Sequence, residues 1–141
     1  MTNRKFALLI LIIPVLLALV TASCNSTRAQ LPEGIYTNTS AEGEPSITFS
    51  GGKYTDMMTS GGNRITVEEG TYVVKGDHIL FTTVKGSDIL RIACGSTNQS
   101  YTYQWLFDQK LKSLTLVNID DPCEIRLNYG ASNTWSYQPL P

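Results

Sequence analysis

Few residues of this chain of 141 can do acid–base or nucleophilic chemistry. His78 is the single histidine, so a Ser-His-Asp arrangement would have to use it. No Gly-x-Ser-x-Gly elbow is present to expose a nucleophilic serine. His78 begins an expected strand beside a turn, which favours a half-exposed structural role over a haem or metal ligand. We therefore expect no catalytic residue and a protein that is not an enzyme.

Carboxylates gather in two places, and either could in principle bind a hard cation. One cluster follows an expected strand and consists of Asp120, Asp121 and Glu124. The spacing of an EF-hand loop is absent there, so we expect solvated turn residues or partners for Arg126. The pair Glu68-Glu69 is placed at a turn and is also expected to be solvated. Accordingly, no metal and no cofactor is expected.

A third pattern suits binding rather than catalysis. Aromatic residues fill every second position of one expected strand: Tyr101, Tyr103, Trp105 and Phe107. Alternate side chains of a strand share a face, so these rings either fill a core or line a cavity. Tyr54 and Tyr72 could join them from neighbouring strands. Such a cavity would bind a small hydrophobic ligand and orient it with phenol hydroxyls; a barrel core filled by side chains is the alternative.

Short strands with turn residues between them must position these groups. From residue 34 onward, alternating or β-branched runs are separated by Gly-Gly, Gly-Asp and Ser-Gly-Gly-Asn turns. No amphipathic helix is apparent, and residues 89–93 and 123–129 are expected to be strands. About eight strands joined in sequence order favour a single all-β, up-and-down antiparallel barrel, because closure removes exposed edges. A two-layer sandwich is the alternative.

Residues 1–23 have the three parts of a secretory signal. Arg4 and Lys5 precede an apolar run over residues 6–20, which we expect to be helical, and small residues follow. Residues 20–22 suit an ordinary signal peptidase, whereas residues 21–24 resemble the bacterial lipobox, in which Cys24 becomes the lipidated first residue. The lipobox route predicts a protein anchored by lipid to a membrane of the cell envelope, and the ordinary route predicts a secreted protein. A third interpretation is that the apolar segment is not cleaved and remains as a membrane anchor. Residues 24–33 are expected to be a flexible tether, and residues 34–141 the barrel domain.

The cysteine count favours the lipidated reading. There are three cysteines, Cys24, Cys94 and Cys123, and an odd number is unusual in an exported protein. If Cys24 carries lipid, Cys94 and Cys123 remain as an even pair for a disulfide in an oxidising compartment. Closing that loop is worth about 3.5 kcal/mol on chain-entropy grounds.

The charge of the chain excludes one class of partner. The whole chain carries 11 basic and 12 acidic residues, and removing residues 1–23 leaves a net charge of −3. No basic patch is present to neutralise phosphates, so nucleic acid is not an expected partner.

Several segments, taken in order, resemble the lipocalin-like (calycin) barrels and small bacterial lipoproteins of that kind. Gly34-Ile35-Tyr36 is similar to the Gly-x-Trp opening of lipocalins, with tyrosine in place of tryptophan. The other segments are residues 70–81, 103–107, 114–116 and 121–126. The resemblance implies a barrel with an apolar interior, a structural role for Gly34 and Tyr36, and an arginine of a late strand, here Arg126, packed by that aromatic ring.

These patterns lead to two hypotheses about function. The first is a lipid-anchored extracytoplasmic barrel that binds a small hydrophobic ligand without chemistry. The second is an interaction, structural or inhibitor module with a filled core, which would present its loops to another envelope protein.

Overall fold

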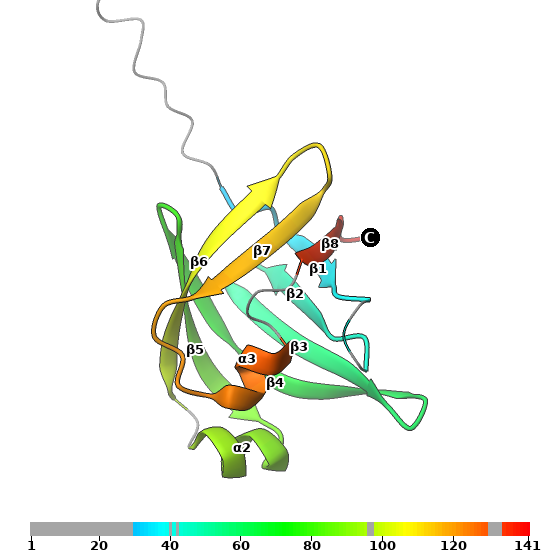
Figure 1. The fold of residues 1–141 in the computed structure, drawn as a ribbon, viewed down its shortest axis with the longest axis vertical. Helices are drawn as coiled ribbons and strands as arrows, with labels where there is room; N and C mark the ends of the chain where they lie inside the picture. The colour runs from blue at the N-terminus through cyan, green and yellow to red at the C-terminus, as the bar shows by residue number, and fades with distance from the viewer. Residues whose placement is uncertain (1–29, 40, 42, 96–97, 130–133) are drawn as a thin grey trace, which may run out of the picture.

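The computed structural model describes residues 30–39, 41, 43–95, 98–129 and 134–141, and eight strands form its centre (Figure 1). The strands are β1 (Gly34–Thr37), β2 (Ser46–Ser50), β3 (Lys53–Ser60), β4 (Asn63–Lys75), β5 (His78–Gly86), β6 (Ser100–Asp108), β7 (Ser113–Asn118) and β8 (Thr134–Gln138). Each strand pairs antiparallel with the next one in the sequence, and β8 pairs with β1. The prediction of a single closed, up-and-down all-β barrel is therefore confirmed.

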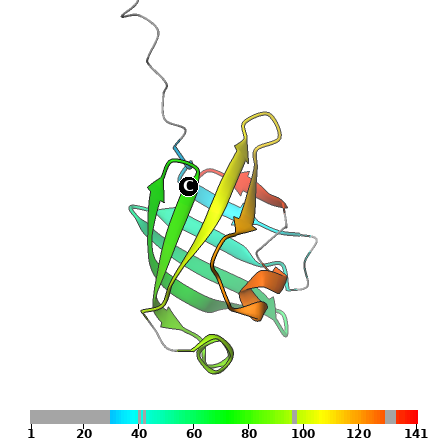
Figure 2. The same ribbon diagram turned by 60° about the vertical axis from the view of Figure 1, so that its left-hand side comes forward.

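Glycines make two of the tight turns that this meander needs. Gly51 and Gly52 join β2 to β3 with φ of 56° and 73°, and Gly61 and Gly62 join β3 to β4 with φ of 57° and 81°. Two successive residues with positive φ match the twist of the flanking strands, and only glycine adopts them without a Cβ clash. The β3–β4 hairpin extends well beyond the barrel wall (Figures 1 and 2).

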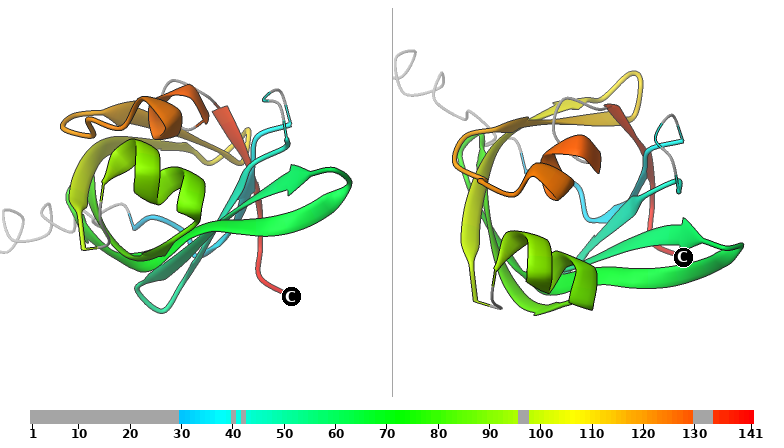
Figure 3. Two further views of the ribbon diagram at one scale, coloured as in Figure 1. Left: turned by 90° about the horizontal axis from the view of Figure 1, so that it is seen from below. Right: turned by 60° about the horizontal axis from the view of Figure 1, so that its bottom comes forward.

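Two short helices occupy places where the sequence led us to expect strands. Residues 89–93 lie in α2 (Asp88–Cys94), and residues 123–129 contain α3 (Glu124–Tyr129). The strand predictions for both segments are wrong, because a short run that contains β-branched or alternating apolar residues does not distinguish a strand from a helix. In α2, the Ser87 hydroxyl accepts a hydrogen bond from the backbone amide of Leu90 and caps the helix. Asp88 lies in the first turn, where a negative charge is favourable. Both helices lie at the same end of the barrel (Figure 3).

The barrel interior divides into an aromatic core and a hollow part. Tyr36 packs edge-on against Phe49 and Phe107, with ring centroids 5.5 and 6.2 Å apart. Tyr36 also contacts Tyr137, and its hydroxyl donates a hydrogen bond to the Pro32 carbonyl at 2.6 Å. These rings pack together at the end of the barrel near residue 30. The other end, beside α2 and α3, is left for a cavity.

Candidate functional site: a cavity beneath the two helices

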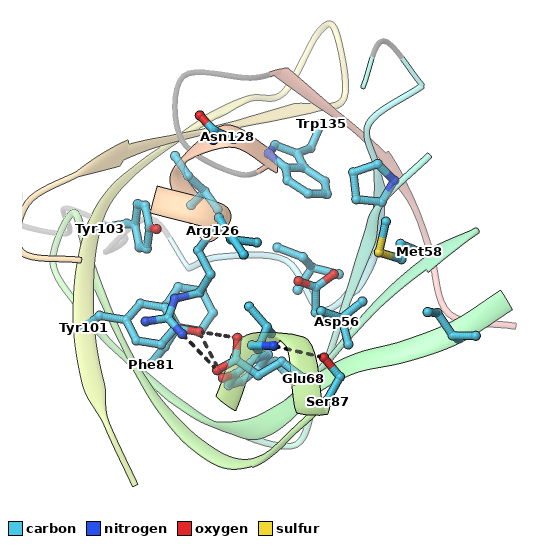
Figure 4. Close-up of a pocket in the computed structure, with 18 of the residues that line it drawn as sticks. Asp56, Met58, Glu68, Phe81, Ser87, Tyr101, Tyr103, Arg126, Asn128 and Trp135 are labelled. Atoms are coloured by element: carbon cyan, nitrogen blue, oxygen red, sulfur yellow. Dashed lines mark hydrogen bonds and ion pairs between the residues drawn. The ribbon is translucent and has the colours of Figure 1, made fainter. Parts of the chain in front are cut away.

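A cavity of about 320 Å³ lies inside the barrel at the end that carries α2 and α3 (Figure 4). Its walls come from β2 to β7, from the start of β8 and from α2 and α3. The apolar lining includes Ile47, Met58, Val67, Phe81, Leu116, Ile125 and Trp135. The polar lining includes Tyr54, Asp56, Glu68, Tyr101, Tyr103 and Arg126. Binding pockets for small molecules have volumes from about 300 Å³ upward, so this cavity has room for a small ligand.

Glu68 is the most deeply placed acid of the cavity, with a relative exposure of 1%. Its carboxylate accepts hydrogen bonds from the hydroxyls of Thr83 and Tyr101, the latter at 3.1 Å. The Tyr101 hydroxyl is in turn 3.0 Å from that of Tyr54. The prediction that Glu68 is solvated is therefore wrong. The segment is not a turn but the middle of the 13-residue strand β4.

A bulge in β4 explains how Glu68 and its neighbour both reach the cavity. Asp56 pairs with Glu68, but the next residue, Met57, pairs with Thr66, so Val67 is an extra residue in β4. An extra residue breaks the alternation of faces. Val67 and Glu68 consequently both line the cavity, although they are adjacent.

Arg126 enters the barrel from α3 and is neutralised there. Its Nε and Nη2 atoms donate to the two carboxylate oxygens of Asp121 at 2.7 and 2.9 Å, and its Nη1 lies 3.5 Å from Glu68. The guanidinium carbon lies 4.0 Å from the centre of the Tyr101 ring. Burial alone would raise the pKa of Asp121, but the hydrogen bonds from Arg126 and Tyr103 outweigh it and lower that pKa. The prediction that this acidic cluster supplies a partner for Arg126 is confirmed for Asp121.

Asp56 differs from these acids because its carboxyl is not satisfied. Its Oδ1 atom is buried and has no hydrogen-bond partner among the described residues, although Asp56 as a whole retains some exposure. Burial, and then the negative charge of Glu68 opposite it, raises the pKa of Asp56 to about 8. Figure 4 shows Asp56 pointing into the space that Glu68 and Arg126 border. An unpaired buried carboxyl costs stability, so it is a candidate for a binding function.

The predicted ligand-binding residues fall into two groups. Tyr54, Tyr101 and Tyr103 line the cavity. Tyr72, Trp105 and Phe107 instead border a second hollow at the opposite end, beside residues 30–33. One strand passes along the whole barrel wall, so residues that share its face do not share one pocket.

Sequence reasoning missed Asp56 and selected Glu68 only as a solvated residue. The phase of β3 and β4 carried a usable signal for both. Asp56 is two positions from the inward-facing Tyr54, and Glu68 is two positions from the buried Gly70. Gly70 itself faces the barrel interior, because a side chain at this position would collide with the Thr82 carbonyl and the Tyr54 ring.

The roles suggested by the lipocalin resemblance are met only in part. A side chain on Gly34 would overlap the Tyr137 ring and the Gln138 carbonyl, so this position needs glycine for close packing. Tyr36 is fully buried. Arg126, however, lies on a helix rather than on a late strand. Its aromatic neighbour is Tyr101, whereas Tyr36 packs among Phe49, Phe107 and Tyr137.

The predicted disulfide joins the two helices that border the cavity. Cys94 ends α2 and Cys123 immediately precedes α3, and their Cα atoms are 5.0 Å apart in the disulfide. The bridge therefore holds α3, which carries Arg126, against α2 at the end of the barrel.

His78 lies away from the cavity, at the β4–β5 turn. Its Nδ1 atom is 2.7 Å from Asp77, and about half of each side chain is exposed. In the part of the chain that the structure describes, no group of three or more His, Cys, Asp or Glu residues could hold a metal ion.

The fold and site define a class: a small closed antiparallel barrel with an apolar cavity that contains ionisable groups. No family model, curated protein or solved structure matches the chain. The predicted signal, Cys24 and most of the predicted tether lie outside the described residues. Within those residues, no helix has the length and apolar character needed to cross a membrane.

Proposed function

We propose that this protein binds a small, mainly apolar molecule in the barrel cavity and does no chemistry on it. The observation that carries the proposal is the cavity of about 320 Å³, which has apolar walls and a few converging polar groups. Burial raises the pKa values of the Tyr54 and Tyr101 hydroxyls, so both phenols stay neutral and can orient a ligand by hydrogen bonds.

We also propose that the barrel is held in the cell envelope by a lipid on Cys24. The signal-like residues 1–23, the lipobox-like residues 21–24 and the odd cysteine count support this location. The disulfide is consistent with an oxidising compartment. Ligand capture by an anchored barrel needs no cofactor and no nucleic acid.

A matched pair of valine substitutions tests whether ligands enter the cavity. Val67→Phe places a ring in the cavity, whereas Val117→Phe adds the same volume to a residue of β7 that is 41% exposed. Titration with an apolar fluorescent probe should give at least tenfold weaker binding for Val67→Phe than for the wild type, and unchanged binding for Val117→Phe.

Native mass spectrometry of the protein purified from its host gives the complementary readout. A co-purified small molecule that Val67→Phe excludes supports the proposal. The proposal fails if no ligand co-purifies and the wild type binds no apolar probe.

One observation favours the second function, a module that binds another envelope protein. The β6–β7 hairpin exposes Leu106, Leu111 and Val117, with relative exposures of 55%, 76% and 41%. Exposed apolar side chains are a feature of many protein interaction sites. Under this reading, Leu111→Lys would abolish co-purification of a partner and leave probe binding intact.

A further inference from the structure

Two carboxyl groups face each other across neighbouring strands of the cavity wall. Asp56 of β3 and Glu68 of β4 are direct partners in the antiparallel register. Like charges in this position repel each other, and burial together with the negative charge of Glu68 raises the pKa of Asp56. Glu68 already accepts hydrogen bonds from Thr83 and Tyr101 and lies beside Arg126, so the buried carboxyl oxygen that lacks a hydrogen-bond partner among the described residues is Oδ1 of Asp56.

The charges around the cavity favour a cationic occupant over an anionic one. Each guanidinium nitrogen of Arg126 that borders the cavity contacts a carboxylate of Asp121 or Glu68. Arg64, at the exposed end of β4, donates to the Glu44 carbonyl and to the hydroxyls of Ser46 and Thr59. An anion would have to displace one of these contacts, whereas a cation meets the unpartnered oxygen of Asp56.

The remaining titratable groups of the cavity do not supply a positive charge. Tyr54 of β3 and Tyr101 and Tyr103 of β6 are phenols whose pKa values burial raises, so they are neutral. Most of the remaining lining residues are apolar, and Phe81, Leu116 and Trp135 are nearly fully buried. The cavity thus combines a carboxyl pair with flat hydrophobic surfaces.

We propose that the ligand is a small amphipathic amine, whose ammonium group lies between Asp56 and Glu68 and whose apolar or aromatic body packs against Phe81, Leu116 and Trp135. This inference rests on the proposed ligand-binding function and specifies the ligand class. The ammonium supplies the donors that Asp56 lacks and separates two like charges.

Binding of an amine must be linked to a proton on Asp56. Because its pKa is about 8 in the empty cavity, Asp56 is mostly protonated near neutral pH. An incoming ammonium stabilises the ionised form, so complex formation releases a proton. The affinity for an amine therefore rises with pH up to about 8, whereas the affinity for a neutral analogue does not.

Three indole compounds of similar size test the inference by isothermal titration calorimetry: tryptamine, tryptophol and indole-3-propionate. We expect the full-length protein to bind tryptamine at least tenfold more tightly than tryptophol. The binding enthalpy of tryptamine should depend on the ionisation enthalpy of the buffer, because the buffer takes up the proton that Asp56 releases. Asp56→Asn should abolish that preference without weakening tryptophol binding. Asp88→Asn, the same substitution at an exposed site on α2, should behave as the wild type.

The outcomes separate this inference from the proposed function. Equal affinity for tryptamine and tryptophol, or a preference that Asp56→Asn leaves intact, overturns the amine assignment. A wild type that binds an apolar probe but not tryptamine overturns it as well, and the ligand-binding proposal then stands. If neither the probe nor any indole binds, both fail. The pH dependence of the wild type needs no variant, so a poorly folded Asp56→Asn protein does not block the test.

Discussion

At the scale of single residues, the cavity carboxylates are the feature that packing alone does not explain. Asp121 is satisfied by Arg126, Tyr103 and the amide of Cys123. Glu68 has three donors around it, but Asp56 leaves a buried oxygen without a partner among the described residues. An unsatisfied buried group costs about 1–3 kcal/mol, which is a large part of the stability of a small domain. A binding role gives a physical reason for keeping it.

Asp56 should make the protein less stable as the pH rises. Its pKa is about 8 in the folded protein and 3.8 as a free side chain, so between these values the folded state holds a proton that the unfolded state releases. The free energy of unfolding therefore falls with increasing pH in this window, by at most about 1.4 kcal/mol per pH unit. Urea unfolding at several pH values from about 5 to 8 should show a flatter profile for Asp56→Asn than for the wild type.

Asp88→Asn is the control for this measurement, since it removes an exposed aspartate from the same barrel end. Its profile should follow that of the wild type. Parallel profiles for the wild type and Asp56→Asn would contradict the assignment of a raised pKa to Asp56.

At the scale of elements, α2 and α3 border the cavity at one end of the barrel. Leu90 of α2 is buried and lines the cavity, and Arg126 of α3 reaches inside it. Both helices are short, seven and six residues, and helices of this length are marginal without tertiary support. The disulfide between Cys94 and Cys123 provides part of that support.

Reduction of the disulfide should destabilise the barrel and loosen the helices. The bridge spans 29 residues, so its loss is expected to lower the free energy of unfolding by about 3.5 kcal/mol. Urea unfolding with and without dithiothreitol measures this difference. The double variant Cys94→Ser/Cys123→Ser should show the low stability in both conditions. A wild type whose unfolding does not respond to reductant would show that the bridge has no stabilising role.

At the scale of the whole molecule, the two ends of the barrel are covered by different segments of the chain. The segment before β1 packs onto one end of the barrel. Leu31 is buried there, and the Glu33 carboxylate accepts a hydrogen bond from the backbone amide of Gly51. Contacts with the barrel thus begin within the residues that were expected to form a tether. The helices α2 and α3 lie at the other end (Figures 1 and 3), and residues of both line the cavity. A chain anchored before Leu31 would therefore present the ligand cavity away from its attachment.

The proposed anchor predicts a defined mature N-terminus. Mass spectrometry of the processed protein should find a first peptide that starts at acylated Cys24, and the protein should sediment with membranes. Cys24→Ser should abolish the lipid mass and the sedimentation, while Cys94→Ser/Cys123→Ser should keep both. A first peptide that starts elsewhere without lipid would contradict the anchor and leave the cavity proposals unaffected.

Local patterns in the sequence were enough to predict the barrel, its hairpins and the Cys94–Cys123 pair. Alternation along β6 identifies inward-facing rings, and Gly-Gly pairs identify turns, because both depend on residues that are neighbours in the chain. The same reasoning assigned α2 and α3 to strands, since short apolar runs do not distinguish a strand from a helix.

The tertiary structure alone decided where the cavity lies and which residues share it. A bulge at Val67 placed that residue in the cavity wall next to Glu68, strand pairing set Asp56 opposite Glu68, and α3 carried Arg126 into the same space. Strand register and helix docking depend on contacts between residues far apart in the chain, whose free energies are not encoded in any local pattern. The sequence therefore determined the kind of fold, and the closure of that fold determined the site.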